Sequence, residues 1–186
     1  MRMTKAVVLI VMLAVASLVG AQTDTNHLGF YPIEEMGVLA KGDLEVDVDL
    51  AGAMLQVAAG AMEGQDGEDA DLAQLVSGLE RVRVQVGVPR GADSSTIAHS
   101  FDQAVSTLEG SGWSRILKVI DEGEQVWLFA RESAGRIVGL TAMVNDEDEE
   151  IVLVNVVGDI DPVVLGKLLA KADQMPDLGQ FMVDGE

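Results

Sequence analysis

The stretch from Trp113 to Val157, WSRILKVIDEGEQVWLFARESAGRIVGLTAMVNDEDEEIVLVNVV, decides the fold of this 186-residue chain. Runs rich in Val, Ile, Leu and aromatic residues alternate there with short polar or glycine-containing segments. Apolar runs bounded by turn residues are typical of consecutive antiparallel strands. The stretch therefore predicts a four-strand meander, with strands at about Trp113 to Ile120, Gln125 to Arg131, Arg136 to Val144 and Ile151 to Val157.

Two more strands are predicted upstream, because apolar and polar residues alternate strictly in two short runs. Asp43 to Asp49 reads DLEVDVD, which places three apolar residues on one face of a strand and four carboxylates on the other. Glu80 to Val88 alternates in the same way, with valines on one face and Arg81, Arg83 and Gln85 on the other. These runs bring the predicted sheet to about six strands.

Helices are predicted between these strands. Leu50 to Met62 reads LAGAMLQVAAGAM, and its Ala, Leu and Met residues favour helix. Ala70 to Gly78 has the pattern of a short second helix. A third helix, ending at Gly110, is expected to be capped by Ser94 or Ser95, since serine side chains accept from free N–H groups.

A last helix is predicted from Pro162, with Asp161 as its cap, because proline suits the first helical position. The complete order is β-α-α-β-α-β-β-β-β-α. Strands and helices in this order predict an α+β domain with a largely antiparallel sheet and helices packed mainly on one face.

The first residues are typical of a secretory signal peptide. Arg2 and Lys5 precede an uncharged apolar run, which ends in small residues before Gln22. The run is shorter than the roughly 20 apolar residues that span a bilayer. Cleavage after Ala21 is predicted, which would make the mature protein periplasmic or secreted, without a transmembrane span; an uncleaved N-terminal membrane anchor is the alternative.

The rest of the chain divides into three parts. Residues 22–42 have no regular period and are expected to form an irregular lead-in. Residues 43–172 are expected to form the single α+β domain, and residues 173–186 a loose acidic tail.

Composition excludes several classes of function. The chain has 31 acidic and 12 basic residues, and this net charge of -19 repels phosphate backbones, so no nucleic-acid partner is expected. It has no cysteine, which excludes thiol catalysis, thiolate metal sites and a lipid attached to cysteine. The apolar content of 48% predicts a packed core rather than a disordered acidic chain.

Clustered carboxylates are the candidate cation ligands. Those on the strand Asp43 to Asp49 are spaced about 6–7 Å apart along one face, because each residue rises about 3.3 Å. An exposed face opposite Arg81 and Arg83 is the favoured interpretation. Neither the loop of residues 63–71 nor the run Asp146 to Glu150 has the spacing of a calcium loop. We predict no cofactor and no specific metal site, and leave weak divalent cation binding open.

The candidate catalytic residues do not form a convincing site. Ser95, His99 and Asp102 are spaced about one helical turn apart on a predicted helix. Residues stacked on one helix surface have no cleft or oxyanion hole of their own. The sequence also contains no glycine-rich phosphate loop and no paired-histidine zinc motif. We therefore predict that the protein is not an enzyme, with an enzyme of unrecognised class as an alternative.

The predicted helix Leu50 to Met62 is apolar nearly all round, so both of its sides need to be covered. In one interpretation the sheet covers one side, and the second helix with the lead-in covers the other. In the other interpretation part of the helix stays open as an interaction surface, with Met54, Ala58 and Met62 as its candidate residues. This second interpretation favours a protein-binding module with an envelope protein partner. A carrier of a small apolar ligand is the alternative.

Several passages are similar to a known family. They are Leu44 to Ala61, Leu75 to Val88, Gly112-Trp113 and the motif Val154-Asn155-Val156-Val157-Gly158-Asp159-Ile160-Asp161. Through them the chain resembles the 4252 family of bacterial domains of unknown function, whose members are mostly exported or lipoprotein-type envelope proteins. The resemblance implies a fold and an envelope location, and it implies no functional residue. The absence of cysteine separates this chain from the lipoprotein members.

Overall fold

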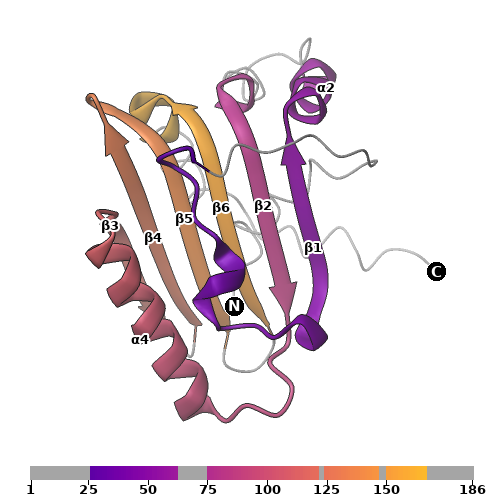
Figure 1. The fold of residues 1–186 in the computed structure, drawn as a ribbon, viewed down its shortest axis with the longest axis vertical. Helices are drawn as coiled ribbons and strands as arrows, with labels where there is room; N and C mark the ends of the chain where they lie inside the picture. The colour runs from indigo at the N-terminus through magenta and orange to yellow at the C-terminus, as the bar shows by residue number, and fades with distance from the viewer. Residues whose placement is uncertain (1–25, 63–74, 122–123, 147–149, 167–186) are drawn as a thin grey trace, which may run out of the picture.

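In the part of the chain that the computed structural model describes, residues 26–62, 75–121, 124–146 and 150–166, six strands form one antiparallel sheet. Their order is β1-β2-β6-β5-β4-β3, which makes β1 and β3 the outer strands (Figure 1). The predicted α+β fold, the meander and the two upstream strands are confirmed. The strands are β1 (Leu44–Ala51), β2 (Leu79–Gly87), β3 (Ser114–Asp121), β4 (Glu124–Ser133), β5 (Arg136–Asp146) and β6 (Ile151–Ile160).

The helical elements also follow the predicted order. They are the 3-10 turns η1 (Ile33–Met36) and η2 (Lys41–Asp43), and the helices α2 (Ala53–Met62) and α4 (Ser94–Gly110). Residues 75–77 and 162–166 are helical as well, while the rest of the predicted second and last helices lies outside the described residues. Asp161 caps the last helix as predicted, since its Oδ1 accepts from the backbone N–H of Val163 at 2.7 Å. The predicted leader and tail are also outside the described residues.

The predicted cap of α4 is wrong by one or two residues. Asp93, rather than Ser94 or Ser95, occupies the cap position, and its Oδ1 accepts from the backbone N–H of Thr96 at 2.8 Å. The Ser95 hydroxyl donates to the same oxygen at 2.7 Å. These hydrogen bonds, the one from Ser95 first, lower the pKa of Asp93. A carboxylate suits this position because the N-terminus of a helix carries partial positive charge.

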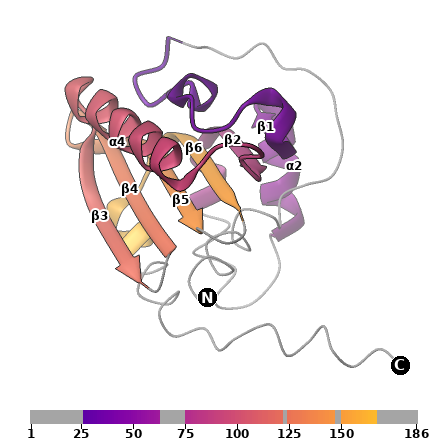
Figure 2. The ribbon, with the colours of Figure 1, turned by 90° about the horizontal axis from the view of Figure 1, so that it is seen from below.

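One face of the sheet is covered by α4 and by residues 26–43, which we call the strap (Figures 1 and 2). We call this face the strap face. Trp127 and Phe129 in β4 pack there against Phe101 of α4, and Ile33 of the strap belongs to the same buried cluster. The strap contains the two 3-10 turns, and it also supplies core residues. Its buried apolar side chains are Tyr31, Ile33, Met36 and Val38.

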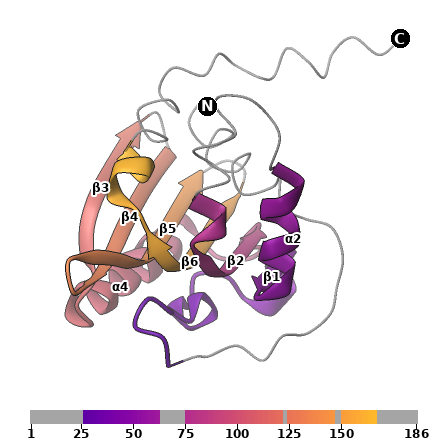
Figure 3. The same cartoon turned by 90° about the horizontal axis from the view of Figure 1, so that it is seen from above.

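The opposite face is built from valines, and we call it the valine face. Cross-strand neighbours such as Val84 and Val154, or Val144 and Val152, pack side by side on it. Helix α2 lies on this side of the sheet, over β1 and β2, whereas the strap lies on the other (Figures 2 and 3). The expectation that the lead-in helps to cover this helix is therefore wrong, because the lead-in covers the opposite face of the sheet.

Candidate functional site

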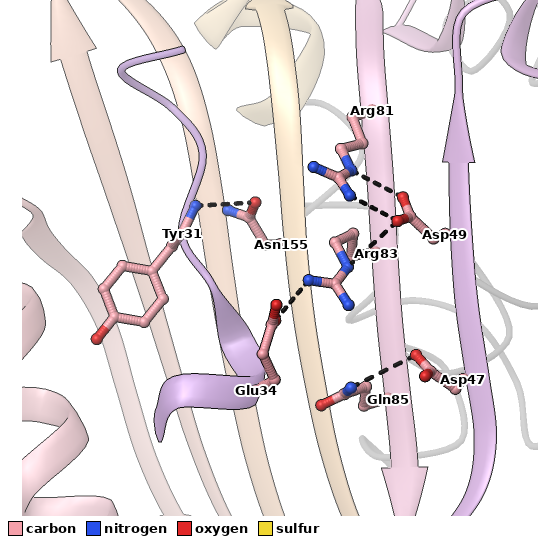
Figure 4. A network of polar contacts seen from close by, with 8 residues as sticks. All are labelled: Tyr31, Glu34, Asp47, Asp49, Arg81, Arg83, Gln85 and Asn155. Atoms are coloured by element: carbon pink, nitrogen blue, oxygen red, sulfur yellow. Dashed lines mark hydrogen bonds and ion pairs between the residues drawn. The ribbon is translucent and has the colours of Figure 1, made fainter. Parts of the chain in front are cut away.

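A network of charged side chains lies between the strap and the first two strands (Figure 4). Arg81 of β2 forms a two-pronged contact with Asp49 of β1, in which Nε donates to Oδ1 at 2.7 Å and Nη2 donates to Oδ2 at 2.5 Å. The planar guanidinium matches a carboxylate in this geometry. Antiparallel pairing of β1 with β2 places Asp49 directly opposite Arg83, one pleat away from Arg81.

Arg83 connects this pair to the strap. Its Nη1 donates to Oε2 of Glu34 in η1 at 2.5 Å, and its Nε lies 3.7 Å from Oδ2 of Asp49. Phe30 of the strap covers Arg81, with the guanidinium carbon 4.8 Å from the ring centroid, a distance typical of a cation–π contact. The strap therefore buries both arginines, which are only 7% and 9% exposed.

The role of this network is structural. Hydrogen bonding from Arg81, followed by the charges of both arginines, lowers the pKa of Asp49 against the opposing effect of burial. A carboxylate held in its ionised form in this way is a weak proton acceptor at neutral pH. The contacts join β1, β2 and the strap, so the network stabilises the docking of the strap on the sheet.

Asn155 holds the strap at a second point, in the centre of the sheet. Its side chain is fully buried in β6, and its Oδ1 accepts from the backbone N–H of Tyr31 at 3.2 Å. Its Nδ2 lies 3.1 Å from the carbonyl oxygen of Gly29, 3.2 Å from that of Leu140 and 3.1 Å from Thr141 Oγ1. Backbone groups of the strap that would otherwise be buried without partners are satisfied by this one side chain.

The carboxylates of β1 lie as the favoured interpretation predicted, on an exposed face opposite the polar side chains of β2. Glu45 accepts from Arg90 at 2.8 Å, and Asp47 accepts from Gln85 at 3.4 Å. Among the described residues, no group of three or more acidic or histidine side chains could hold a metal ion. Residues 63–71 and most of the run Asp146 to Glu150 are outside the described parts.

The residues of the candidate triad are on α4, as predicted, and they do not contact one another as a triad would. The Ser95 hydroxyl is engaged with Asp93 at the helix cap, at 2.7 Å. His99 is exposed one turn further along the helix, and so is Asp102. This arrangement gives Ser95 a role at the cap where α4 begins, and leaves the absence of catalysis a prediction.

The α2 surface is described only in part. Met54 is half-buried, Leu55 faces the interior at 1% exposure, and Val57 is 66% exposed. The side chains of Ala58 and Met62 are outside the described residues. The proposed interaction surface on this helix therefore stays a prediction.

A second apolar surface follows the outer strand β3. Ile116, Leu117 and Ile120 are 46%, 37% and 64% exposed, and large aliphatic side chains exposed together on one strand are an informative feature of a surface. Arg115 and Lys118 lie among them and are exposed too. We call residues 115–120 the β3 edge. Among the described strands, β3 pairs with β4 on one side only.

Sequence reasoning missed Asn155 as the anchor of the strap and the β3 edge as a candidate surface, although both had a signal. Asn155 is the lone polar residue within VLVNVV, and such a residue in an apolar strand calls for buried partners. The β3 edge follows from the strand order, because the first strand of a meander is an outer strand unless another segment pairs with it.

Comparison with known protein families identifies the family of the chain. The model of a family described as a domain of unknown function (DUF4252) matches residues 41–168. The match spans β1 to β6 and begins at η2, so most of the strap precedes it. No curated protein and no solved structure matches the chain.

Proposed function

Because the chain belongs to the DUF4252 family, whose description assigns no activity, we propose a function from its own surface: an exported, non-enzymatic module that binds another protein. The β3 edge is the observation that carries this proposal. An outer strand presents backbone N–H and C=O groups to which an extended segment can add as a further strand. Natural proteins usually protect such edges, so an edge with exposed Ile116, Leu117 and Ile120 suits a binding surface.

The polar groups of the described residues support the non-enzymatic part of the proposal. Asp49 is hydrogen-bonded to Arg81, Ser95 to Asp93 at the cap of α4, and Asn155 to the backbone of the strap. Each of these side chains has a structural partner that accounts for its position. A catalytic carboxylate or hydroxyl would instead be directed toward a site where substrate binds.

Export is proposed from the first 21 residues, whose basic start, apolar run and small-residue end are typical of a signal peptide. Within the described residues no helix is long and apolar enough to cross a membrane. An envelope location would give the β3 edge access to periplasmic or extracellular proteins.

The surface of α2 is a second candidate for the same function. Val57 is exposed and Met54 is half-buried beside it. Both residues belong to the helix on the valine side of the sheet, far from β3 (Figure 3).

Site-specific photo-crosslinking in the native host tests the proposal. A benzophenone amino acid replaces Ile120, and the matched control replaces Val163, which is equally exposed at 66% against 64% but lies on the last helix. We expect a crosslinked protein from position 120 and none from position 163. A third variant, at Met54, examines the α2 surface. If neither position 120 nor position 54 captures a protein, the protein-binding function is wrong; a small molecule retained on the purified chain would then favour the carrier.

A further inference from the structure

The two outer strands of the sheet have complementary surfaces. β1 carries Glu45, Asp47 and Asp49, while the β3 edge carries Arg115 and Lys118. We propose that the β3 edge binds the outer edge of β1 from a second copy of this chain, so that copies associate head to tail into a continuous sheet. This inference rests on the proposed protein-binding function of β3 and names the partner.

The charges of the two edges lie on the same face of the sheet. On β1, Asp49 pairs with Arg83, which also pairs with Glu34 of the strap, so Asp49 lies on the strap face. On β3, Arg115 lies 3.5 Å from Glu109 of α4, and the Lys118 ammonium lies 5.6 Å from the centroid of the Trp127 ring beneath α4. Since α4 and the strap cover one face together, a sheet continued from one copy to the next would bring acids and bases to the same side.

Part of the apolar surface of the two edges shares the other face, whereas Ile120 lies on the same face as Lys118. Val46 and Val48 of β1 are half-buried and pack on the valine face, and Val119 of β3 packs on it too. Leu117 is two residues from Val119 and therefore points to the same side of the strand. Contact between the edges would bury these side chains against one another.

Strand direction and length also fit. Neighbours alternate in direction across the described sheet, so β3 and β1 are antiparallel, and β1 of a second copy continues the alternation after β3. Both strands have 8 residues. When their ends are aligned, Lys118 lies opposite Asp47 on the strap face, while Leu117 and Val119 lie opposite Val48 and Val46.

The same charges disfavour the other edge pairings. Two β1 edges would bring carboxylates together, and two β3 edges would bring Arg115 and Lys118 close to their own copies. Like charges on adjacent strands destabilise a sheet, and opposite charges stabilise it. Pairing of β3 with β1 is thus the combination that the charges favour, and because it uses two different surfaces it leaves a free edge at each end of the assembly.

Asp47 is the carboxylate best suited to bind the partner. Glu45 is held by Arg90 at 2.8 Å, and Asp49 is held by Arg81 and Arg83. The contact between Asp47 and Gln85 is longer, at 3.4 Å, and it joins a charged group to a neutral one. Asp47 can therefore turn toward Lys118 of a second copy at little cost to its own fold.

Charge exchange between the two edges tests the pairing. Sedimentation velocity of the protein purified from its own host is measured for the wild type, Lys118→Glu, Asp47→Lys and an equal mixture of the two variants. We expect a series of dimers and larger species that grows with wild-type concentration. Each variant alone should associate at least about tenfold more weakly, because its two edges repel. The mixture should recover, since the carboxylate introduced at position 118 of one variant meets the ammonium introduced at position 47 of the other, and the remaining edges keep their native charges.

A matched control and the contrary outcomes make the test decisive. Asp102→Lys changes the charge by the same amount on α4 and should leave association unchanged, and far-UV circular dichroism checks that each variant is folded. A wild type that stays monomeric at all concentrations, that stops at a dimer, or whose variants fail to recover on mixing overturns the head-to-tail pairing. If position 120 then crosslinks to a different protein, the proposed function stands and only the partner is wrong; if it crosslinks to nothing, the β3 edge is not a binding surface.

Discussion

Asn155 in the central strand β6 accepts a hydrogen bond from the backbone N–H of Tyr31, 124 residues earlier in the chain, at 3.2 Å. The same side chain also reaches the carbonyl oxygen of Gly29. The strap is therefore bound to the middle of the sheet by one amide, while Arg83 holds it nearer the β1 edge through Glu34. The strap is thus joined to the sheet at two separate points.

Replacing Asn155 by alanine should lower the free energy of unfolding by about 2–4 kcal/mol, because buried donors and acceptors of the strap and of β5 lose their partner. Urea unfolding followed by tryptophan fluorescence measures the change, since Trp113 and Trp127 are both buried beneath α4 and the strap. Thr141→Val, which removes one contact of the amide, should cost less. Equal stability of Asn155→Ala and the wild type would show that the amide does not hold the strap.

Gly139 should not tolerate even a methyl group. A Cβ built on it lies 2.5 Å from the Cα atom and 2.5 Å from the carbonyl oxygen of Gly29, where the strap crosses β5. Gly139→Ala is expected to destabilise the fold by about 1–3 kcal/mol through overpacking. Gly110→Ala is the control, because a Cβ on Gly110 meets nothing within 4 Å at the end of α4. A Gly139→Ala variant as stable as this control would contradict the close crossing of the strap.

Acid should remove the contribution of Asp49 to stability. Its pKa in the folded protein is lowered, mainly by the hydrogen bond from Arg81, so the folded state binds its proton less readily than the unfolded state. The stabilisation is complete above the usual pKa of 3.8 and is lost as the pH falls through the lower folded value. Thermal melts from pH 7 to pH 2 should therefore show a steep fall in stability below about pH 4.

The variant Asp49→Asn tests whether this carboxylate causes the loss of stability in acid. At pH 7 the variant should be less stable than the wild type by about 1–3 kcal/mol, since the buried Arg81 loses its charged partner. The difference should shrink as the pH falls below about 4. Asp47→Asn removes the same charge from the same face of β1 and should show a smaller gap at pH 7. If the difference in stability between Asp49→Asn and the wild type does not change with pH, this carboxylate is not the source of the acid sensitivity.

The mature protein should begin at Gln22. Signal peptidase cleaves after small residues, and Val19-Gly20-Ala21 provides them at the end of the apolar run. Intact mass spectrometry of the protein from its own host measures the N-terminus. A mass that still includes residues 1–21 would favour the N-terminal anchor over the released form.

The sequence predicted the strands well, because alternation of apolar and polar residues depends on nearest neighbours. Leu44 to Ala51 and Leu79 to Gly87 lie within two residues of the predicted bounds. The sequence also predicted which face of β1 is apolar and which carries carboxylates, since Asp47 and Asp49 alternate with valines. These patterns are local, and the pleat turns them directly into two faces.

The position of the strap and the residues that hold it could not be predicted from local patterns. Ile33 and Met36 are buried because Asn155 and Arg83, which come far later in the chain, hold the strap on the sheet. No local period marks a segment whose order comes from distant partners. The cap of α4 was missed for a simpler reason, since Asp93, Ser94 and Ser95 are all good cap residues and only the backbone geometry selects among them.

The native mass of the protein, gently extracted from its own host, tests the protein-binding account most directly. The account predicts a complex, in which the chain carries a protein partner or whole copies of itself, and predicts that Lys118→Glu lowers the population of the complex. A bare single chain at every concentration, unchanged by Lys118→Glu, would contradict it.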